Sequence, residues 1–373
     1  MSKKISELDF PKEAEMEKKI EDTANSIYES ILSNAAPKVE VPVRSLNNVN
    51  FDPKDGYFEI KGNKKQRTMT ASTIKTFAQT LRLMALSKEL MEADDMATKR
   101  EAYYVSKNWG EAKFNEQPES DSVMDDIEAM LYTFRESMRF IAGEKGGGLV
   151  AGDLTVIDIE QDTRQPIEID CTKFGSGAYS IPSILEHFKF KTSAKFILVV
   201  ETAGMFERLN KHKFWKKHDC IIIGTGGVPP RASRRFIRKL SDDHNLPVYV
   251  FTDGDPYGYL NIYRTLKVGS GNSAHINKFF CVPKAKLLGV TPKDIKDYNL
   301  PTHDLKDIDI KRIKDGIKND PFVKQHKEWQ DALQMMAKMK QRVEQQAFAK
   351  HGLNMVIEKY LPEKLANPKT WLP

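Results

Sequence analysis

From about residue 195 onward, short apolar runs alternate with helical segments. The runs cover residues 196–200, 220–223, 248–251 and 279–282, and polar residues, glycines or prolines follow them. Strands that are apolar along their whole length are typical of parallel sheets covered by helices on both faces. The pattern therefore predicts an α/β domain with a mainly parallel sheet, in which functional groups gather beyond the carboxyl ends of the strands.

Acidic residues follow two of these predicted strands. Glu201 comes directly after the first run, and Asp253 and Asp255 close the third run in the sequence Asp-Gly-Asp-Pro. Because the carboxyl ends of parallel strands meet at one edge of a sheet, we expect Glu201 and Asp253 to lie close together. Three carboxylates would repel one another without a cation, and Mg²⁺ completed by water or a phosphate is the simplest partner. Asp255 followed by Pro256 also fits a helix cap.

A predicted helix after the second strand concentrates arginines on one arc and apolar residues on the opposite one. The arginines are Arg231, Arg234, Arg235 and Arg238. A solvated helix face is the ordinary explanation of such an arc. Because no acidic residue interrupts it, we favour contacts with the phosphates of a nucleic acid.

The preceding region, residues 70–160, is predicted to hold helices followed by a β element. Apolar residues recur at helical spacing from Ile74 to about Leu90, and a second such helix precedes a glycine-rich turn and an alternating strand that ends at Glu160. This order predicts a winged-helix (CAP-like) domain of the α+β type, a fold that docks onto DNA.

Arg100 and Tyr104 lie four residues apart in this region, so a helix would place them on one face. A tyrosine phenol is a weak nucleophile at its usual pKa, and a neighbouring guanidinium could stabilise the phenolate or hold the phosphate that it attacks. By itself an adjacent pair such as Tyr103 and Tyr104 more often serves core packing, and only the predicted metal site and DNA-docking fold favour a catalytic role.

Composition limits the classes of protein that remain. The formal charge of +6 comes from 58 basic and 52 acidic residues, so a basic surface must be local. The three cysteines are widely spaced, which argues against a zinc site or a disulfide framework and predicts a reducing cytoplasmic compartment. No apolar run reaches the length of about eighteen residues that a membrane span needs.

Two further patterns concern partners. Ile20, Ala24, Ile27 and Ile31 form an apolar stripe on a predicted N-terminal helix, which either packs on its own chain or docks onto a partner subunit. The phosphate-binding pattern G-x-x-x-x-G-K-[ST] is absent from the sequence. If the reaction needs ATP, another chain must supply the site for it.

Taken together, four motifs resemble those of the A subunits of archaeal DNA topoisomerase VI, the type IIB topoisomerases, and of the related meiotic double-strand-break transesterases. The motifs are Lys99-Arg-Glu-Ala-Tyr-Tyr104, Gly147-Gly-Leu-Val-Ala-Gly152, Val200-Glu201 and Thr252-Asp-Gly-Asp-Pro-Tyr-Gly258. The resemblance covers nearly the whole chain and implies a Toprim domain, in which the last two motifs carry the metal ligands.

The resemblance implies a mechanism and an assembly. Tyr104, four residues after Arg100, would attack a DNA phosphodiester and form a 5′-phosphotyrosyl link, while Glu201 and Asp253 hold Mg²⁺ and Asp255 supports a second ion or the phosphate. The chain would act as a homodimer whose composite centres take tyrosine and metal ligands from different copies. An ATPase B subunit would complete an A2B2 heterotetramer for strand passage, supercoil relaxation or decatenation of nucleoid DNA.

The expected domains are residues 1–69 as a partner-docking segment, 70–160 as the winged-helix domain with the catalytic tyrosine, and 161–373 as the Toprim domain with a C-terminal helical extension. Two alternatives remain open from the sequence. One is a Toprim nuclease or break-forming transesterase that does not rejoin DNA. The other is a non-catalytic winged-helix DNA-binding protein whose acidic residues are structural.

Overall fold

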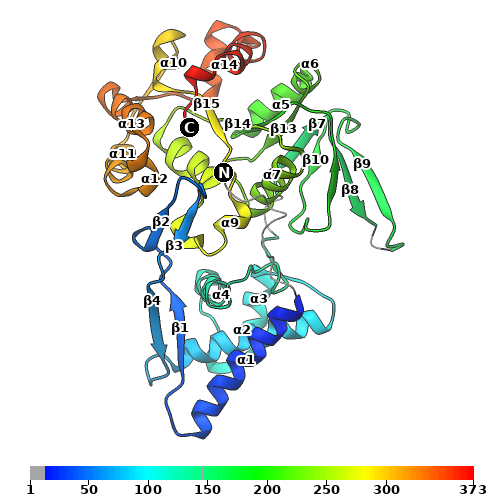
Figure 1. Cartoon of the computed structure of the whole chain (residues 1–373), viewed down its shortest axis with the longest axis vertical. Helices are drawn as coiled ribbons and strands as arrows, with labels where there is room; N and C mark the ends of the chain where they lie inside the picture. Colours follow the sequence, from blue (N-terminus) through cyan, green and yellow to red (C-terminus); the bar gives the residue numbers. More distant parts are fainter. Residues whose placement is uncertain (1–12, 144–146, 161) are drawn as a thin grey trace.

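The computed structural model describes residues 13–143, 147–160 and 162–373. It shows two lobes, a smaller one built mainly from helices and a larger α/β body (Figure 1). Within the described residues, none of the helices combines the length and the apolar character that a membrane span requires.

Four helices form the smaller lobe around an apolar core. They are α1 (Glu13–Leu32), α2 (Ile74–Glu92), α3 (Lys99–Val105) and α4 (Gln117–Leu131). The helix predicted from Ile74 onward is confirmed. The apolar stripe of α1 is divided, because Ile20 and Ile27 are buried whereas Ile31 is 49% exposed. The first turns of α1 therefore pack on their own chain, and its last turn is left open.

A two-stranded antiparallel sheet joins this lobe. It consists of β1 (Lys38–Pro42) and β4 (Lys64–Thr68), and β1 packs on α4. Arg44 and Arg67 both form ion pairs with Asp126 of α4, at 2.9 and 2.7 Å. These bonds fix the small sheet against the helices.

A six-stranded sheet organises the body in the order β10-β7-β13-β12-β14-β15. The strands are β7 (Leu149–Gly152), β10 (Tyr179–Ser180), β12 (Phe196–Val200), β13 (Cys220–Gly224), β14 (Val248–Phe251) and β15 (Lys286–Gly289). The last four run parallel to one another, and β7 and β10 are antiparallel additions. The prediction of a mainly parallel sheet is confirmed.

Helices cover both faces of the sheet, which explains why its central strands are apolar throughout. Along β12, Ile197 packs in the core beneath α7 (Arg231–His244), whereas its neighbour Leu198 packs in the core beneath α5 (Ala203–Lys211). Side chains alternate between the faces of a strand, so a sheet that is buried on both sides needs an apolar residue at every position.

The predicted strand at 279–282 is wrong. Residues Asn277–Phe280 form the short helix α9, and the edge strand of the sheet is β15, a few residues later. Phe279 and Phe280 are apolar for another reason, since their rings contact Phe134 of the smaller lobe with centroids 5.1 and 5.7 Å apart. The run belongs to the contact between the lobes.

The β element that was expected to complete a winged helix also lies in the body. β7 joins the six-stranded sheet, and β8 (Thr155–Ile159) pairs with β9 (Pro166–Asp170) and β11 (Lys189–Lys191) in a separate three-stranded sheet. The expected boundary between residues 160 and 161 thus separates two paired strands. Besides β1 and β4, the smaller lobe contains a short parallel pair of strands, β5 (Ala97–Thr98) and β6 (Phe140–Ile141).

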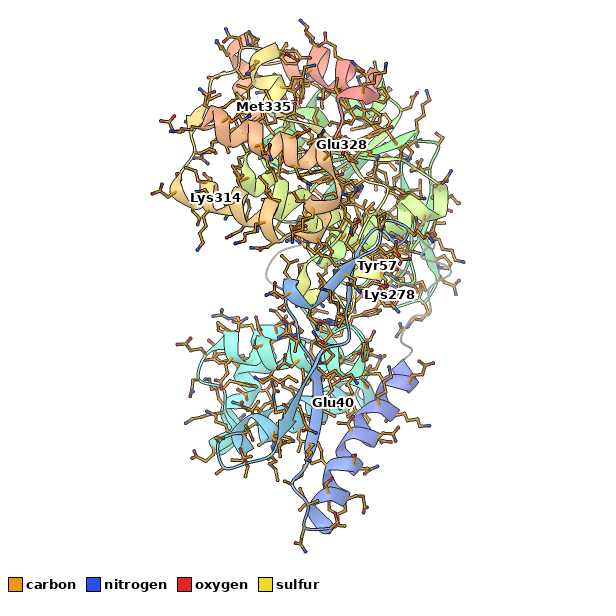
Figure 2. The ribbon with its side chains drawn as sticks, turned by 60° about the vertical axis from the view of Figure 1, so that its left-hand side comes forward. Glu40, Tyr57, Lys278, Lys314, Glu328 and Met335 are labelled. Atoms are coloured by element: carbon orange, nitrogen blue, oxygen red, sulfur yellow. The ribbon has the colours of Figure 1, made fainter. Side chains whose placement is uncertain are left out.

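The expected N-terminal segment 1–69 is shared between the lobes. β2 (Val49–Phe51) and β3 (Phe58–Ile60) pair with each other and pack on the body, while β1 and β4 stay with the smaller lobe. Figure 2 shows Tyr57, which directly precedes β3, beside Lys278 of the body. The same figure shows Glu40 of β1 on the smaller lobe. Residues 1–12, part of that expected segment, lie outside the described residues.

The carboxyl-terminal part wraps around the end of the sheet. Its elements include α11 (Asp307–Asn319), α12 (Pro321–Gln325), α13 (Lys327–Met339), β17 (Gln341–Arg342), η7 (Gln345–His351), η8 (Val356–Tyr360) and α14 (Leu361–Ala366). The C-terminal extension is thus helical for the most part, but it consists of several short helices. The helical pattern is interrupted at His326 and ends at Met339, where the chain turns back towards the sheet.

Candidate functional site

The strand-end acids come together as the parallel pattern predicts. β12 and β14 are hydrogen-bonded neighbours, Glu201 follows β12 directly, and Asp253 lies two residues beyond β14. The backbone N–H of Asp253 donates to Oε2 of Glu201 at 2.9 Å. The fold therefore places two carboxylates at one edge of the sheet.

A third segment, which the sequence analysis missed, completes this edge. Gly254 forms backbone hydrogen bonds in both directions with Val343, and the N–H of Gln345 donates to Oδ1 of Asp253 at 2.8 Å. The buried Gln345 side chain accepts from Oγ1 of Thr202 and donates to the carbonyl of Phe251, each at 2.7 Å. No pattern in the sequence links residues 341–345 to the acids, because tertiary folding alone brings them together.

Asp255 has the capping role that the sequence allowed. Its Oδ1 accepts from the N–H of Gly258 at 2.6 Å, at the start of the helical segment that begins with Pro256. Its other oxygen lies 3.9 Å from Nη1 of Arg342. Asp255 is thus held at the same edge as Asp253, with one oxygen bonded to the backbone.

Burial and mutual repulsion make this edge electrostatically unfavourable without a cation. Burial, together with the charge of Asp253, raises the pKa of Glu201 to about 8, and burial raises the pKa of Asp253 to about 6. Burial also raises the pKa of Asp255. A bound cation would favour the ionised form of all three carboxyl groups.

The donor set fits Mg²⁺. Among the described residues, no group of three or more acidic, histidine or cysteine side chains is arranged to hold a metal ion. Mg²⁺ is commonly held by one or two carboxylates and keeps water or substrate phosphate in its remaining positions. Glu201 and Asp253, with Asp255 beside them, would leave that space open.

The two adjacent tyrosines of α3 have different surroundings. The hydroxyl of Tyr103 donates to the carbonyl of Asn115 at 3.0 Å, and Nζ of Lys107 lies over its ring. Tyr104 is 55% exposed, and the guanidinium carbon of Arg100 lies 5.7 Å from the centre of its ring. Of this pair, Tyr104 is therefore the one that presents its phenol to the surface.

α3 is positioned by its own lobe. Thr98 and Glu101 form a reciprocal capping box at its N-terminus, and the helix packs on α4, β5 and β6. Figure 1 places α3 in the smaller lobe and β14 in the body, where β12 pairs with it. Tyr104 and the acids thus belong to different lobes of the chain.

The predicted arginine face is not open to solvent. Arg234, Arg235 and Arg238 are buried, and Arg231 is half-buried with only 11% of its side chain exposed. α7 is covered on both sides, by the sheet on one and by α9 and the smaller lobe on the other, which argues against the phosphate contacts favoured from the sequence.

Carboxylates of the same chain, one in α7 itself and two from other segments, neutralise most of these arginines. Arg231 binds both carboxylate oxygens of Glu128 in α4, at 2.5 and 2.8 Å. Arg238 donates to Asp242 at 2.6 Å, and Arg235 donates to Glu186 at 3.3 Å. The guanidinium of Arg234 lies 5.9 Å from the ring centre of Phe280. These contacts join α7 to its surroundings and, through Glu128, to the smaller lobe.

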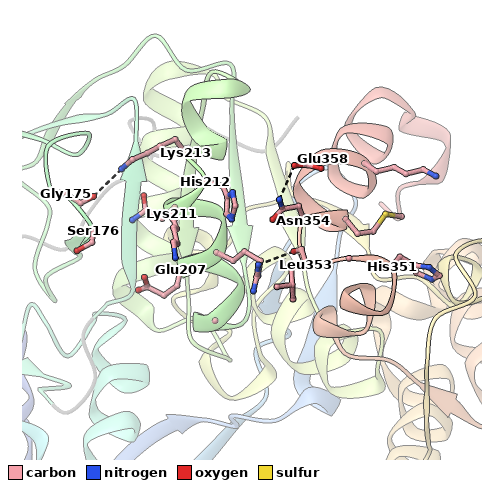
Figure 3. Close-up of a pocket in the computed structure, with 16 residues that line it drawn as sticks. Gly175, Ser176, Glu207, Lys211, His212, Lys213, His351, Leu353, Asn354 and Glu358 are labelled. Carbon is pink, nitrogen blue, oxygen red and sulfur yellow. Dashed lines mark hydrogen bonds between the residues drawn. The ribbon is translucent and has the colours of Figure 1, made fainter.

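A cleft whose lining includes several basic side chains lies along α5. It has a volume of ≈ 1460 Å³ and lies between α5 and residues 351–359 (Figure 3). Lys211 and His212 line it, with Glu207 and Glu358 as acids. Since α5 begins two residues after Glu201, the helix links the cleft to the acidic edge.

Three family models together cover most of the chain. Residues 75–140 match a model described as type IIB DNA topoisomerase, and residues 144–194 match the all-beta domain in the DNA topoisomerase VI alpha chain. Residues 196–365 match the Toprim domain of Spo11 and of the topoisomerase 6 A subunit. The second match coincides with the three-stranded sheet and its flanking segments, and the third with the parallel part of the body.

Full-length relatives agree with these matches. The chain is 52% identical over 363 residues to the type 2 DNA topoisomerase 6 A subunit of Methanocaldococcus jannaschii, with 97% of each chain covered. The Pyrococcus abyssi protein of the same name is 39% identical, with 94% of each chain covered. The corresponding protein of Methanothermobacter thermautotrophicus is 35% identical, with 93% of this chain and 96% of the relative covered.

A Toprim sheet with acids at its strand ends, preceded by a tyrosine-bearing helical lobe, defines the class as the DNA-cleaving subunits of type IIB topoisomerases. The identity to full-length relatives narrows this further. The chain belongs to the family of DNA topoisomerase 6 A subunits.

Proposed function

We propose that Tyr104 is the nucleophile with which this topoisomerase chain cleaves and rejoins duplex DNA. The observation that carries the assignment is the difference between the two tyrosines, since the hydroxyl of Tyr103 is bound to Asn115 while Tyr104 is exposed beside Arg100. A cationic neighbour favours the phenolate and can hold a phosphate oxygen.

The reaction is a transesterification. The Tyr104 phenol oxygen attacks the phosphorus, its proton is released, and the bond from phosphorus to the 3′ oxygen breaks. The products are a 5′-phosphotyrosyl link and a 3′-hydroxyl, which takes up a proton. Because one phosphodiester replaces another, the reverse attack by the 3′-hydroxyl restores the DNA without a further energy source.

Glu201 and Asp253 would hold Mg²⁺, with Asp255 in support. When bound, the ion would neutralise charge on the reacting phosphate and stabilise the oxygens that bear it. The residues themselves keep the edge organised, because Gln345 and the backbone of Asp253 fix the two carboxylates by hydrogen bonds. Arg100 would orient the phosphate at the tyrosine.

The assembly proposed for this reaction is an A2B2 heterotetramer. The position of Tyr104 and the acids on different lobes supports a homodimer in which each cleavage centre takes its tyrosine from one copy of the chain and its metal ligands from the other. The absence of a P-loop pattern in the sequence supports a separate ATPase B subunit. The exposed Tyr28, Ile31 and Leu32 at the end of α1 are a candidate docking surface for it.

The DNA path proposed here follows the basic cleft beside α5 instead of the arginines of α7. Lys211 and Lys213 would contact phosphates of a DNA arm that leaves the acidic edge. Lys213 already donates to the carbonyl of Gly175 at 3.2 Å, which holds the side chain at the rim of the cleft. We place the reaction on chromosomal DNA in the cytoplasm.

The decisive test is capture of the covalent adduct. The chain, its ATPase partner, Mg²⁺, an ATP analogue and supercoiled plasmid are mixed, then denatured, and protein attached to DNA 5′ ends is measured. Tyr104→Phe should lose the adduct by at least about a thousandfold while it still binds DNA, because the variant keeps the ring and lacks the attacking oxygen.

Tyr103→Phe is the matched control, since it removes a hydroxyl from the neighbouring ring. It should retain most of the adduct. An adduct that persists in Tyr104→Phe and disappears in Tyr103→Phe would assign the nucleophile to Tyr103. Double-strand breaks that accumulate and are never rejoined after Mg²⁺ removal would instead favour a break-forming transesterase.

A further inference from the structure

The backbone pairing of the segment after β17 places Arg342 beside the strand-end acids. Arg342 is the last residue of β17, and the next residue, Val343, pairs with Gly254 between the two aspartates. Its Nη1 lies 3.9 Å from Oδ2 of Asp255, and its charge acts to lower the pKa of Asp253 and of Asp255. A guanidinium is thus fixed beside the carboxylates proposed to hold Mg²⁺.

The hydrogen-bonding capacity of Arg342 is not used within the described part of the chain. Its Nε is buried and has no hydrogen-bond partner, and the distance of 3.9 Å to Asp255 is too long for a hydrogen bond. By contrast, Arg231 and Arg238 make short bonds to Glu128 and Asp242. A buried donor without an acceptor is costly, and the long contact with Asp255 leaves the partly exposed guanidinium able to donate to an acceptor from outside the chain.

The missing acceptor has a defined chemistry. It must approach from the open side of Arg342, whose side chain is 24% exposed, and it must tolerate the neighbouring carboxylates. A phosphate meets both conditions, because its oxygens match the planar guanidinium fork and a metal ion held by Glu201 and Asp253 would offset the negative charge. A free carboxylate at this place would only add to the repulsion.

We infer that Arg342 is a substrate-binding residue that donates to a non-bridging oxygen of a DNA phosphate at the Glu201–Asp253 edge. The inference rests on the proposed function for the identity of the phosphate, but not on the identity of the nucleophile. Arg342 would hold one non-bridging oxygen of the phosphate, and Asp255 would keep the guanidinium near this position.

The test measures binding without chemistry, in a Tyr104→Phe background, with the ATPase partner present. The affinity for a fluorescent duplex is measured with and without Mg²⁺ over a range of salt concentrations. Arg342→Gln should weaken Mg²⁺-dependent binding by roughly tenfold or more, as expected for a hydrogen bond to a charged group. It should also reduce the salt slope by about one, since one phosphate contact is lost.

Arg312→Gln is the matched control. Arg312 has the same exposed side-chain fraction of 24% and lies over the nearby Tyr257, but it already pairs with Asp309 at 3.2 Å. Its removal should leave the Mg²⁺-dependent affinity within about twofold of the parent. Equal effects of the two substitutions would show a general loss of charge and overturn the inference.

A purely structural role for Arg342 predicts another pattern. Arg342→Gln would then lower the thermal midpoint of the DNA-free protein and leave the affinity and salt slope of the folded fraction unchanged, which overturns the inference. If Arg342→Gln does not fold, Arg342→Lys decides, because it keeps the charge and loses the fork. Lysine should still weaken Mg²⁺-dependent binding several-fold, and parental affinity in that variant would refute the contact.

Failure of the proposed function gives a separate signature. If Tyr104 is not the nucleophile, the adduct experiment fails while the effect of Arg342→Gln on binding persists. If Arg342 does not contact phosphate, the adduct still forms through Tyr104 and the binding effect is absent.

Discussion

The arginines of α7 and the acids at the strand ends are both clusters of like charge inside one body, yet their surroundings differ. Arg231, Arg235 and Arg238 each bond to a carboxylate of the same chain. At the strand ends, the ion pair that the structure describes is the long contact of Asp255 with Arg342. Both clusters have a high density of charge. The difference is that the α7 arginines are paired with carboxylates and stabilise the fold, whereas the strand-end acids lack such partners and are suited to bind a cation.

This comparison is tested most strongly at the pair of Arg231 and Glu128. Arg231→Ala should lower the free energy of unfolding by about 3–5 kcal/mol, because it leaves a buried carboxylate with a much weaker set of partners. Urea denaturation at neutral pH measures the change. Lys195→Ala removes a surface ion pair to Asp219 and should leave the stability almost unchanged. Similar small losses in both variants would mean that the α7 arginines do not hold the lobes together.

The opposite behaviour is expected at the acidic edge. Asp253→Asn should raise the thermal midpoint of the metal-free protein, because it removes repulsion with Glu201 and Asp255. Mg²⁺ at about a hundred times its dissociation constant should stabilise the parent by about 2.7 kcal/mol, a shift of several degrees. It should not stabilise Asp253→Asn.

Calorimetry with and without Mg²⁺ makes this measurement, and Glu201→Gln should behave like Asp253→Asn. Asp304→Asn, on the exposed strand β16 (His303–Asp304), serves as a control that keeps the response to the ion. If Mg²⁺ stabilised both variants as much as the parent protein, the ion would bind elsewhere, and the strand-end acids would not differ from the α7 arginines in needing a ligand.

The smallest expected effect concerns DNA binding, and it compares the lysines of the cleft beside α5 with the arginines of α7. Lys211→Ser together with Lys213→Ser should reduce the slope of log affinity against log salt by about two, because each lysine neutralises one phosphate. Arg234→Gln, which alters the buried arc of α7, should leave the slope unchanged if the protein stays folded. The reverse result would return DNA contact to α7 and remove it from the cleft beside α5.

The sequence was sufficient where the signal is local or follows from topology. Glu201 and Asp253 were placed together because parallel strands align their carboxyl ends, and the structure has them bonded. The pairing of Asp255 with the helix at Pro256 was visible as a capping pattern. These inferences needed no knowledge of distant contacts.

The sequence was insufficient where the same residue pattern occurs in two different structural environments. The arginine arc of α7 looks the same whether water or carboxylates face it, and its partner Glu128 lies far away in the chain. Phe279 and Phe280 looked like a strand because contact between the lobes also needs apolar residues. Gln345 and Arg342 gave no signal, since their role depends on a turn of the chain after Met339.

The excursion of β2 and β3 into the body has a mechanical consequence. The chain crosses between the lobes before β2, after β3 and again between β6 and β7. Asn48 clasps the first two crossings, donating to the carbonyls of Val43 and Asn63 at 2.8 and 3.0 Å. A lobe attached by several straps resists torsion far better than one on a single tether. Under the proposed function, opening a gate between two copies of the chain would then move each copy as a unit, with Tyr104 kept apart from the acids of its own chain.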